Sequence, residues 1–260
     1  MRHGEFDSDT VALQQRLQTH DRYGTRDLNE WIFSILTPKP GDKILDLGCG
    51  TGKQAIPLAK TVGEAGHVVA LDVSQQAVDA VSEYVRELGL DQLVTVICGS
   101  LDDVGSLLGD RQFDRIVASF SIYYVEDPER LFRTLRDLSA PRGALFFCGP
   151  SATNNSEIIA FHNQVKGDAA GTAGTADAFM QGEGQALARE YFTNVELYEF
   201  ENPIRFDSAD ALCDYWMSYN LYDPAIETKF REAAEDHFRN NVHFKTTKRV
   251  IGVCARCPHP

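Results

Sequence analysis

The stretch from Lys43 to Gln54, KILDLGCGTGKQ, constrains the fold more than any other part of the chain. A short apolar run leads to Asp46, and glycines follow at alternate positions, Gly48, Gly50 and Gly52. Such glycines allow positive φ and let a ligand approach the backbone closely. If a helix follows, its N-terminal N–H groups favour an anionic group at the same place. The stretch therefore predicts a ligand-binding turn between a buried strand and a helix.

Strand and helix patterns alternate after this turn. Four further apolar runs predict buried strands: residues 67–73, 93–99, 113–120 and 144–149. Amphipathic stretches between them predict helices, with Ser74 and Asp127 as N-cap residues and Pro128 at a first helical position. Elements in this order indicate an α/β fold with a parallel sheet and helices on both faces. Ligands of such sheets bind at the carboxyl ends of the strands.

The pattern changes after Pro150. Helices are expected at about 155–165, 185–192, 208–219 and 224–240, and strands at 195–206 and 246–255. The stretch 167–184 is rich in Gly, Ala and Thr, which predicts either a mobile surface loop or a lid that excludes water.

We expect a single domain over residues 1–260. Its parts are an N-terminal helical lid segment (1–28), a cofactor-binding core (29–150) and a substrate-side region (151–260). The last region combines helices, a small helical cap insertion at about 207–241 and the closing strands.

The chain is acidic, with a formal net charge of −13. Such a surface repels phosphate backbones, so we expect no nucleic-acid partner. Lys245, Lys248 and Arg249 lie close together, and we interpret them as the solvated face of a strand. The first residues, MRHGEFDSDT, lack the apolar core of a signal peptide, and no run approaches the ~18 apolar residues of a membrane span. The sequence therefore predicts a cytoplasmic protein without a membrane partner.

The cysteines give no sign of a disulfide scaffold, because six in 260 residues are too few. Those beside apolar runs are interpreted as small buried hydrophobes: Cys49, Cys98, Cys148 and Cys213. Cys254 and Cys257 form a C-x-x-C pair near His259, but no second ligand pair accompanies them. We therefore predict no metal site.

Two aspartates narrow the class of ligand. The glycines read G-x-G-x-G, whereas dinucleotide-binding proteins carry G-x-G-x-x-G. Asp46 would repel a pyrophosphate at this turn but suits a ligand ammonium. Asp72 ends the second predicted strand and suits the two hydroxyls of a ribose, as an acidic residue also does in NAD proteins. A ligand with an amino group, a carboxylate and a nucleoside fits best.

Three stretches in this order resemble the motifs of class I S-adenosylmethionine-dependent methyltransferases: ILDLGCGTGK, VVALDVS and FDRIVASFSIYYVEDPERLFRTLRDLSAPRGALFF. The similarity covers roughly residues 28–150. The resemblance implies a Rossmann-like seven-stranded, mostly parallel sheet, whose last strand is antiparallel and inserted next to the fifth. It also implies S-adenosylmethionine as the cofactor.

The resemblance assigns cofactor-binding roles to residues of this chain. The methionine moiety would be lined by Asp46, Gly48, Cys49, Gly50, Thr51 and Gly52. Asp72 would hold the ribose, and Val73 would flank the adenine. The adenine edge would meet Ser100, Leu101 or Asp102, although many relatives carry an acidic residue where this chain has Ser100. Ser119 and Phe120 would border the reactive sulfonium, and Tyr23 would close over the cofactor.

Methyl transfer to oxygen needs a group that removes a proton, whereas a neutral amine needs no strong base. His162, Tyr123 and Tyr124 are the catalytic candidates, and His20, His237 and His243 are weaker ones. Packing roles explain each of these side chains as well.

Trp216, Tyr219 and Tyr222 recur at three-residue spacing, so they share a helix face. Such a stripe is typical of a core, and on a cap it would also suit an acceptor pocket.

The favoured hypothesis is a methyltransferase that moves a methyl group by in-line displacement to an oxygen or nitrogen atom of a small molecule. The alternatives are a macromolecular methyltransferase, acting on protein or RNA, and a non-catalytic protein that binds S-adenosylmethionine. A homodimer is compatible with the sequence.

Overall fold

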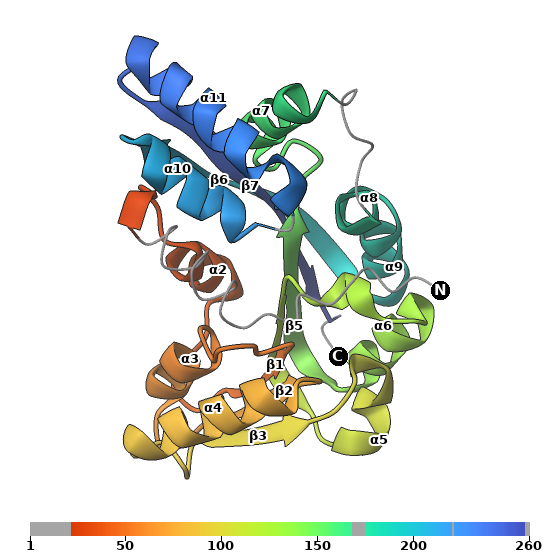
Figure 1. The fold of residues 1–260 in the computed structure, drawn as a ribbon. Helices are drawn as coiled ribbons and strands as arrows, with labels where there is room; N and C mark the ends of the chain where they lie inside the picture. Colours follow the sequence, from red (N-terminus) through yellow and green to blue (C-terminus); the bar gives the residue numbers. More distant parts are fainter. Residues whose placement is uncertain (1–21, 168–174, 220, 258–260) are drawn as a thin grey trace.

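The fold is described from a computed structural model, which covers residues 22–167, 175–219 and 221–257 (Figure 1). Most of the expected N-terminal lid segment, His20, His259 and residues 168–174 of the Gly/Ala-rich stretch lie outside the described residues. In the described part of the chain, no helix combines the length and apolar character needed to cross a membrane.

A seven-stranded sheet has the order β3-β2-β1-β4-β5-β7-β6. The strands are β1 (Lys43–Leu47), β2 (His67–Asp72), β3 (Val94–Cys98), β4 (Phe113–Ser119), β5 (Ser139–Pro150), β6 (Thr193–Phe206) and β7 (Phe244–Arg256). β1 to β5 are parallel, and β7 lies antiparallel between β5 and β6. This arrangement confirms the predicted fold class, including the last strand next to the fifth.

Helices cover both faces of the sheet. They are α2 (Leu28–Leu36), α3 (Ala55–Val62), α4 (Gln75–Glu87), α5 (Val104–Leu108), α6 (Pro128–Asp137), α7 (Ser156–Lys166), α8 (Thr175–Gln181), α9 (Glu183–Tyr191), α10 (Ala209–Met217) and α11 (Glu227–Asn240). Three short 3₁₀ turns are η1 (Leu101–Asp103), η2 (Ile122–Tyr124) and η3 (Pro224–Ile226). Ser74 and Asp127 are N-caps as predicted, accepting hydrogen bonds from the backbone N–H groups of Ala77 and Arg130.

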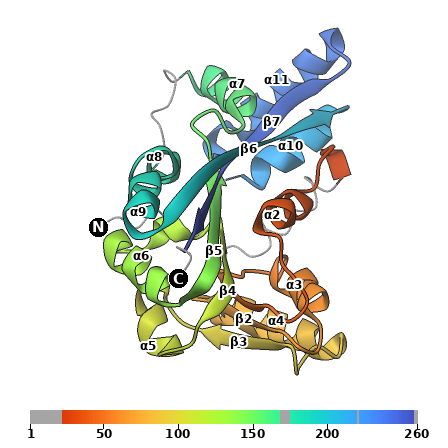
Figure 2. The same cartoon turned by 180° about the vertical axis from the view of Figure 1, so that it is seen from behind.

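Alternate residues of the strands contribute to two hydrophobic cores, one on each face of the sheet, because successive side chains point to opposite faces. Leu45 packs with α5, α6, α8 and α9 on one face, and Ile44 packs with α2, α3 and α4 on the other. Figures 1 and 2 show these two helical layers from opposite sides.

The β6–β7 ladder extends beyond the sheet. β7 pairs with β5 only from Val250 to Arg256, whereas its pairing with β6 continues to Phe244. The protruding part of this ribbon packs with α7, α10 and α11 around a third core that includes Trp216 and Phe230. We call this unit the cap (Figure 1). It stands next to the carboxyl end of β5.

The stretch 167–184 differs from the expected loop. Residues 175–181 form α8, whose Phe179 and Met180 are buried in the same core as α6 and α9. These two apolar side chains fix residues 175–181 against the core, although the stretch is rich in Gly and Ala.

The cysteines are placed largely as expected, with one correction. Cys49, Cys148 and Cys213 are buried, but Cys98 is exposed at the end of the edge strand β3. Cys254 and Cys257 belong to the cores on opposite faces of the sheet. Residues three apart along a strand face opposite ways, so these two sulfurs cannot share one ion.

Candidate functional site

The glycine turn joins β1 to α3 at the carboxyl edge of the parallel strands. The backbone N–H groups of Gly48 and Cys49 donate to the Leu71 carbonyl at 2.7 and 3.0 Å, which fixes the turn against the end of β2. Gly48, Gly50 and Gly52 all have positive φ, as predicted from their type and position.

Gly48 and Gly50 meet different surroundings. A Cβ on Gly48 would lie 2.3 Å from the Cβ of Ser121, whereas a Cβ on Gly50 would meet nothing within 4 Å. Ser121 is buried, and its Oγ donates to the Leu47 carbonyl at 2.6 Å. Close packing therefore requires glycine at position 48, and the turn is open at position 50, where a ligand can approach.

Asp46 is an unusual buried charge. It is 0% exposed, and neither of its carboxylate oxygens has a hydrogen-bond partner in the described structure. Burial, followed by the nearby charge of Asp72, raises the pKa of Asp46 to about 7. A cationic ligand group beside the turn would relieve this cost, because a buried carboxylate is stable only when it is paired. The residues present therefore fit the ammonium of S-adenosylmethionine.

Asp72 links the turn to the start of α4. Its Oδ2 accepts from the Gly50 N–H at 2.8 Å, and its Oδ1 accepts from the Ser74 N–H at 2.9 Å. A carboxylate offers about four lone-pair positions, so acceptor capacity remains for the two hydroxyls of a ribose.

One cavity gathers much of the predicted cofactor set. Its lining residues are Gly48, Asp72, Val73, Ser100, Leu101, Asp102, Ser121, Tyr124 and Val125. Val73 is 43% exposed and offers an apolar surface to a flat ring. Sequence reasoning missed Ser121 and Val125, although both follow the carboxyl end of β4, where the active edge was expected.

Ser100 and Asp102 also have local structural partners. The Asp102 carboxylate accepts from the backbone N–H groups of Glu126 and Asp127 at 3.1 and 3.4 Å. The Ser100 Oγ accepts from the Asp102 N–H at 3.1 Å. Asp102 thus holds the segment after η2 against the cavity wall.

The carboxyl ends of β4 and β5 meet beside this cavity. Ser119 Oγ lies 3.5 Å from Cys148 Sγ, and the Phe120 N–H donates to the Cys148 carbonyl at 2.9 Å. Phe120 has a φ of 60°, a left-handed conformation that is rare for a bulky residue and frequent at functional sites. The Lys248 ammonium lies 4.9 Å from the centre of the Phe120 ring.

Tyr123 and Tyr124 stand on η2, directly after β4. Their ring centres are 4.7 Å apart, and Tyr124 lines the cavity. Burial first, and then Tyr124, raise the pKa of Tyr123 well above its usual value. Tyr123 therefore keeps its proton and is not poised to act as a base.

His162 and Tyr23 belong to the cap. His162 is 5% exposed, and its Nδ1 accepts from Trp216 Nε1 at 3.1 Å. The Tyr23 ring packs 5.4 Å from Phe206. Neither side chain lines the cavity, so the structure does not bring these two predicted site residues to the glycine turn.

The aromatic stripe divides between two roles. Trp216 is fully buried and stacks on Phe230 at 4.0 Å, and Tyr222 packs on Trp216 at 5.0 Å. Tyr219 instead receives hydrogen bonds from the side-chain amides of Asn154 and Asn155 at 3.4 and 3.3 Å. Tyr219 also contributes to the raised pKa of Tyr123, after burial, Tyr124 and Cys148.

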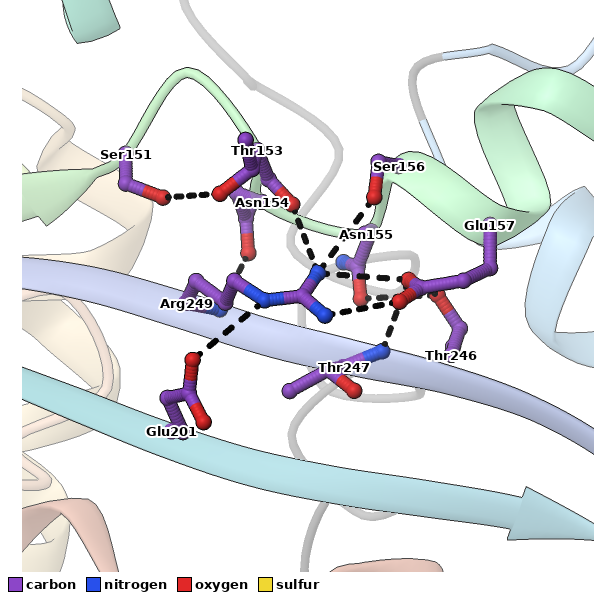
Figure 3. A network of polar contacts seen from close by, with 10 residues as sticks. All are labelled: Ser151, Thr153, Asn154, Asn155, Ser156, Glu157, Glu201, Thr246, Thr247 and Arg249. Carbon is purple, nitrogen blue, oxygen red and sulfur yellow. Dashed lines mark hydrogen bonds and ion pairs between the residues drawn. The ribbon is translucent and has the colours of Figure 1, made fainter.

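A polar network anchors the segment after β5 to the cap ribbon (Figure 3). Arg249 donates to Glu157 Oε1 at 2.7 Å and to the Thr153 carbonyl at 2.8 Å. Its backbone N–H donates to Asn154 Oδ1 at 3.0 Å, which turns the Asn154 amide nitrogen toward Tyr219. The Arg249 side chain therefore holds this segment in place. It is not part of the solvated strand face that the sequence predicts.

The fold and this site define an α/β protein with a cavity at the carboxyl edge of a Rossmann-like sheet. Residues 44–143 match the methyltransferase domain family. A crystal structure of an S-adenosylmethionine-dependent methyltransferase from Aquifex aeolicus has a TM-score of 0.59 at 16% identity, and the match covers 98% of this chain and 100% of that one. This likeness shows the fold.

Two curated relatives agree with the family. Demethylmenaquinone methyltransferase of Lactobacillus johnsonii is 31% identical over 133 residues, which are 50% of this chain and 54% of that protein. Nocamycin O-methyltransferase of Saccharothrix syringae is 32% identical over 119 residues, 46% of this chain and 41% of that protein. The chain thus spans about half the length, or less, of these relatives.

Residues 44–143 are thus similar to a methyltransferase domain, and this is the part of the chain that the family match covers. This similarity agrees with the resemblance of the ordered motifs to class I S-adenosylmethionine-dependent methyltransferases.

Proposed function

We propose that the protein moves a methyl group to an oxygen or nitrogen atom of a small-molecule acceptor. The observation that carries this proposal is the buried, unpaired carboxylate of Asp46 beside the open glycine turn. The charge of Asp72 contributes to the raised pKa of Asp46, and Asp72 lines the cavity at the turn. S-adenosylmethionine offers an ammonium and a ribose for these two groups.

S-adenosylmethionine supplies a methyl group on a sulfonium, which the acceptor attacks in line. We assign to the chain the work of alignment, which can lower the barrier substantially when the reacting atoms are held in contact. The turn at Gly50 admits the ligand, Asp72 accepts from the ribose, and Phe120 borders the reacting end. Exclusion of water at the junction of core and cap strengthens these contacts.

A small-molecule acceptor is supported by three observations. The net charge of −13 disfavours nucleic acid. Tyr219 of the cap receives hydrogen bonds from Asn154 and Asn155, so the cap contacts the segment after β5, and a covered site suits a compact acceptor. The relatives are named for demethylmenaquinone and nocamycin, and the latter is an O-methyltransferase.

Calorimetric titration with S-adenosylmethionine and S-adenosylhomocysteine tests the cofactor site. We expect micromolar binding that Asp72→Ala abolishes and that Asp79→Ala, at an exposed position of α4, leaves unchanged. Absence of binding to the wild-type protein would refute the proposal.

Transfer of a labelled methyl group in a cell extract then tests the acceptor class. We expect label in the small-molecule fraction, bound through oxygen or nitrogen. Label confined to protein or RNA would favour a macromolecular methyltransferase, and label on carbon would correct the acceptor atom. Cofactor binding without any transfer would indicate a non-catalytic binding protein.

A further inference from the structure

Two carboxylates in the described part of the chain have buried oxygens without a hydrogen-bond partner, those of Asp46 and Asp177. The cofactor ammonium accounts for Asp46. Asp177 is 7% exposed, and its Oδ1 is the unpartnered atom. A buried carboxylate oxygen without a partner lowers the stability of a fold, and a ligand that donates a hydrogen bond to it relieves this cost.

Asp177 lies on the helix that borders the active edge. α8 packs against η2 and β5. Met180 is fully buried and so close to the end of β5 that a Cβ on Gly149 would lie 2.7 Å from both Met180 Cγ and Tyr123 Cε1. The Phe179 ring lies 6.5 Å from the Tyr123 ring. Residues three apart share a helix face, so Asp177 is on the Met180 side of α8.

The other candidate bases at this edge are unsuitable. The Nδ1 of His162 already accepts from Trp216 within the cap. Burial raises the pKa of Tyr123 well above its usual value, and it raises the pKa of the Cys148 thiol to about 11. Asp177 is a buried carboxylate on α8, which packs against η2, and Tyr124 of η2 lines the cofactor cavity.

We propose that Asp177 is a catalytic residue that accepts the proton of the acceptor's nucleophilic O–H or N–H group. The inference rests on the proposed function. The acceptor lone pair forms the bond to the methyl carbon, the carbon–sulfur electron pair stays on sulfur, and the acceptor proton passes to the Asp177 carboxylate. The acceptor is accordingly a hydrogen-bond donor: an alcohol, a phenol or an amine.

The test uses two cofactor analogues and needs no acceptor. S-adenosylhomocysteine lacks the transferred methyl group, whereas sinefungin carries a primary amine at that position. We expect Asp177→Asn to weaken sinefungin binding about tenfold, because the amine loses an opposite charge nearby, and to leave S-adenosylhomocysteine binding unchanged. The control is Asp91→Asn, at an exposed position before β3, which should change neither affinity.

Each outcome decides a separate point. Unchanged sinefungin binding in Asp177→Asn would place Asp177 away from the methyl group and overturn the inference. Failure of the wild-type protein to bind either analogue would instead refute the proposed function.

Thermal unfolding of the free protein adds an independent readout. Asp177→Asn should unfold at an equal or higher temperature than the wild type, because the side chain that carries the buried, unpartnered Oδ1 loses its charge. A lower unfolding temperature would show that Asp177 makes a structural contact and would contradict the inference. Once the acceptor is known, the same variant should lose about 10²–10⁴-fold in kcat for methyl transfer to oxygen.

Discussion

At the residue scale, the site depends on a charge that the fold buries before any ligand arrives. Asp46 sits at the end of β1, and burial, followed by the charge of Asp72, raises its pKa from 3.8 to about 7. Between these values the folded protein keeps a proton that the unfolded chain has released. The free energy of unfolding must therefore fall as pH rises through this window.

We expect this group to lower stability by about 3 kcal/mol between pH 4 and pH 7, since each pKa unit corresponds to about 1.4 kcal/mol and ionisation is partial at both ends of this window. Urea unfolding at several pH values measures the slope. Asp46→Asn should flatten it, whereas Asp79→Asn, on the exposed face of α4, should retain it. An identical slope in wild type and Asp46→Asn would contradict the assignment.

Gly48 tests the packing of the turn. Gly48→Ala should destabilise the protein by about 2 kcal/mol or more, because φ is positive and the new Cβ meets Ser121. Gly50→Ala should lower stability by only about 1 kcal/mol, since its surroundings are open.

A second substitution tests the same contact: Ser121→Gly removes the Cβ that a new side chain at position 48 would meet. The double variant Gly48→Ala/Ser121→Gly should therefore be more stable than Gly48→Ala alone. Denaturant unfolding of the wild type, the single variants and the double variant measures this difference. Additive losses in the double variant would mean that the contact with Ser121 is not the cause.

At the element scale, α8 packs the core against the turn that follows β4. Phe179 and Met180 are buried, and their packing holds this short helix against η2 and β5. A seven-residue helix has little stability of its own, so tertiary packing must hold it in place.

Met180→Ala should therefore destabilise the protein by about 2–5 kcal/mol and speed hydrogen exchange across residues 175–181. Gln181→Ala, at an exposed position of the same helix, is the matched control. Unchanged exchange in Met180→Ala would show that other contacts dock α8.

At the scale of the whole molecule, the sheet edge and the cap are joined through the β6–β7 ribbon. A ligand that binds only the folded state stabilises it by about 2.7 kcal/mol at 100 times its Kd. For a chain of this size we expect S-adenosylhomocysteine at that excess to raise the Tm by about 5–10 °C. Differential scanning calorimetry measures the shift, and Asp72→Ala should abolish it. An equal shift in that variant would place the ligand elsewhere.

The local elements were predictable because their signals lie within a few residues. Apolar runs marked the strands, Ser74 and Asp127 marked helix starts, and the glycine turn with Asp46 and Asp72 located the cofactor edge. The order of these elements then limited the topology, since parallel strands need crossover helices on the sheet faces.

Tertiary contacts decided the roles of side chains that look alike in sequence. Trp216 and His162 are far apart along the chain but hydrogen-bond inside the cap, while Tyr219 turns toward the segment after β5. A Cβ at position 48 would meet Ser121 only because β1 and β4 are neighbours. The sequence alone determined the fold class and the cofactor edge, because periodicity, capping and turn chemistry are local. Burial, pairing and the lack of a partner for Asp177 Oδ1 depend on distant segments meeting, so only the folded structure decided them.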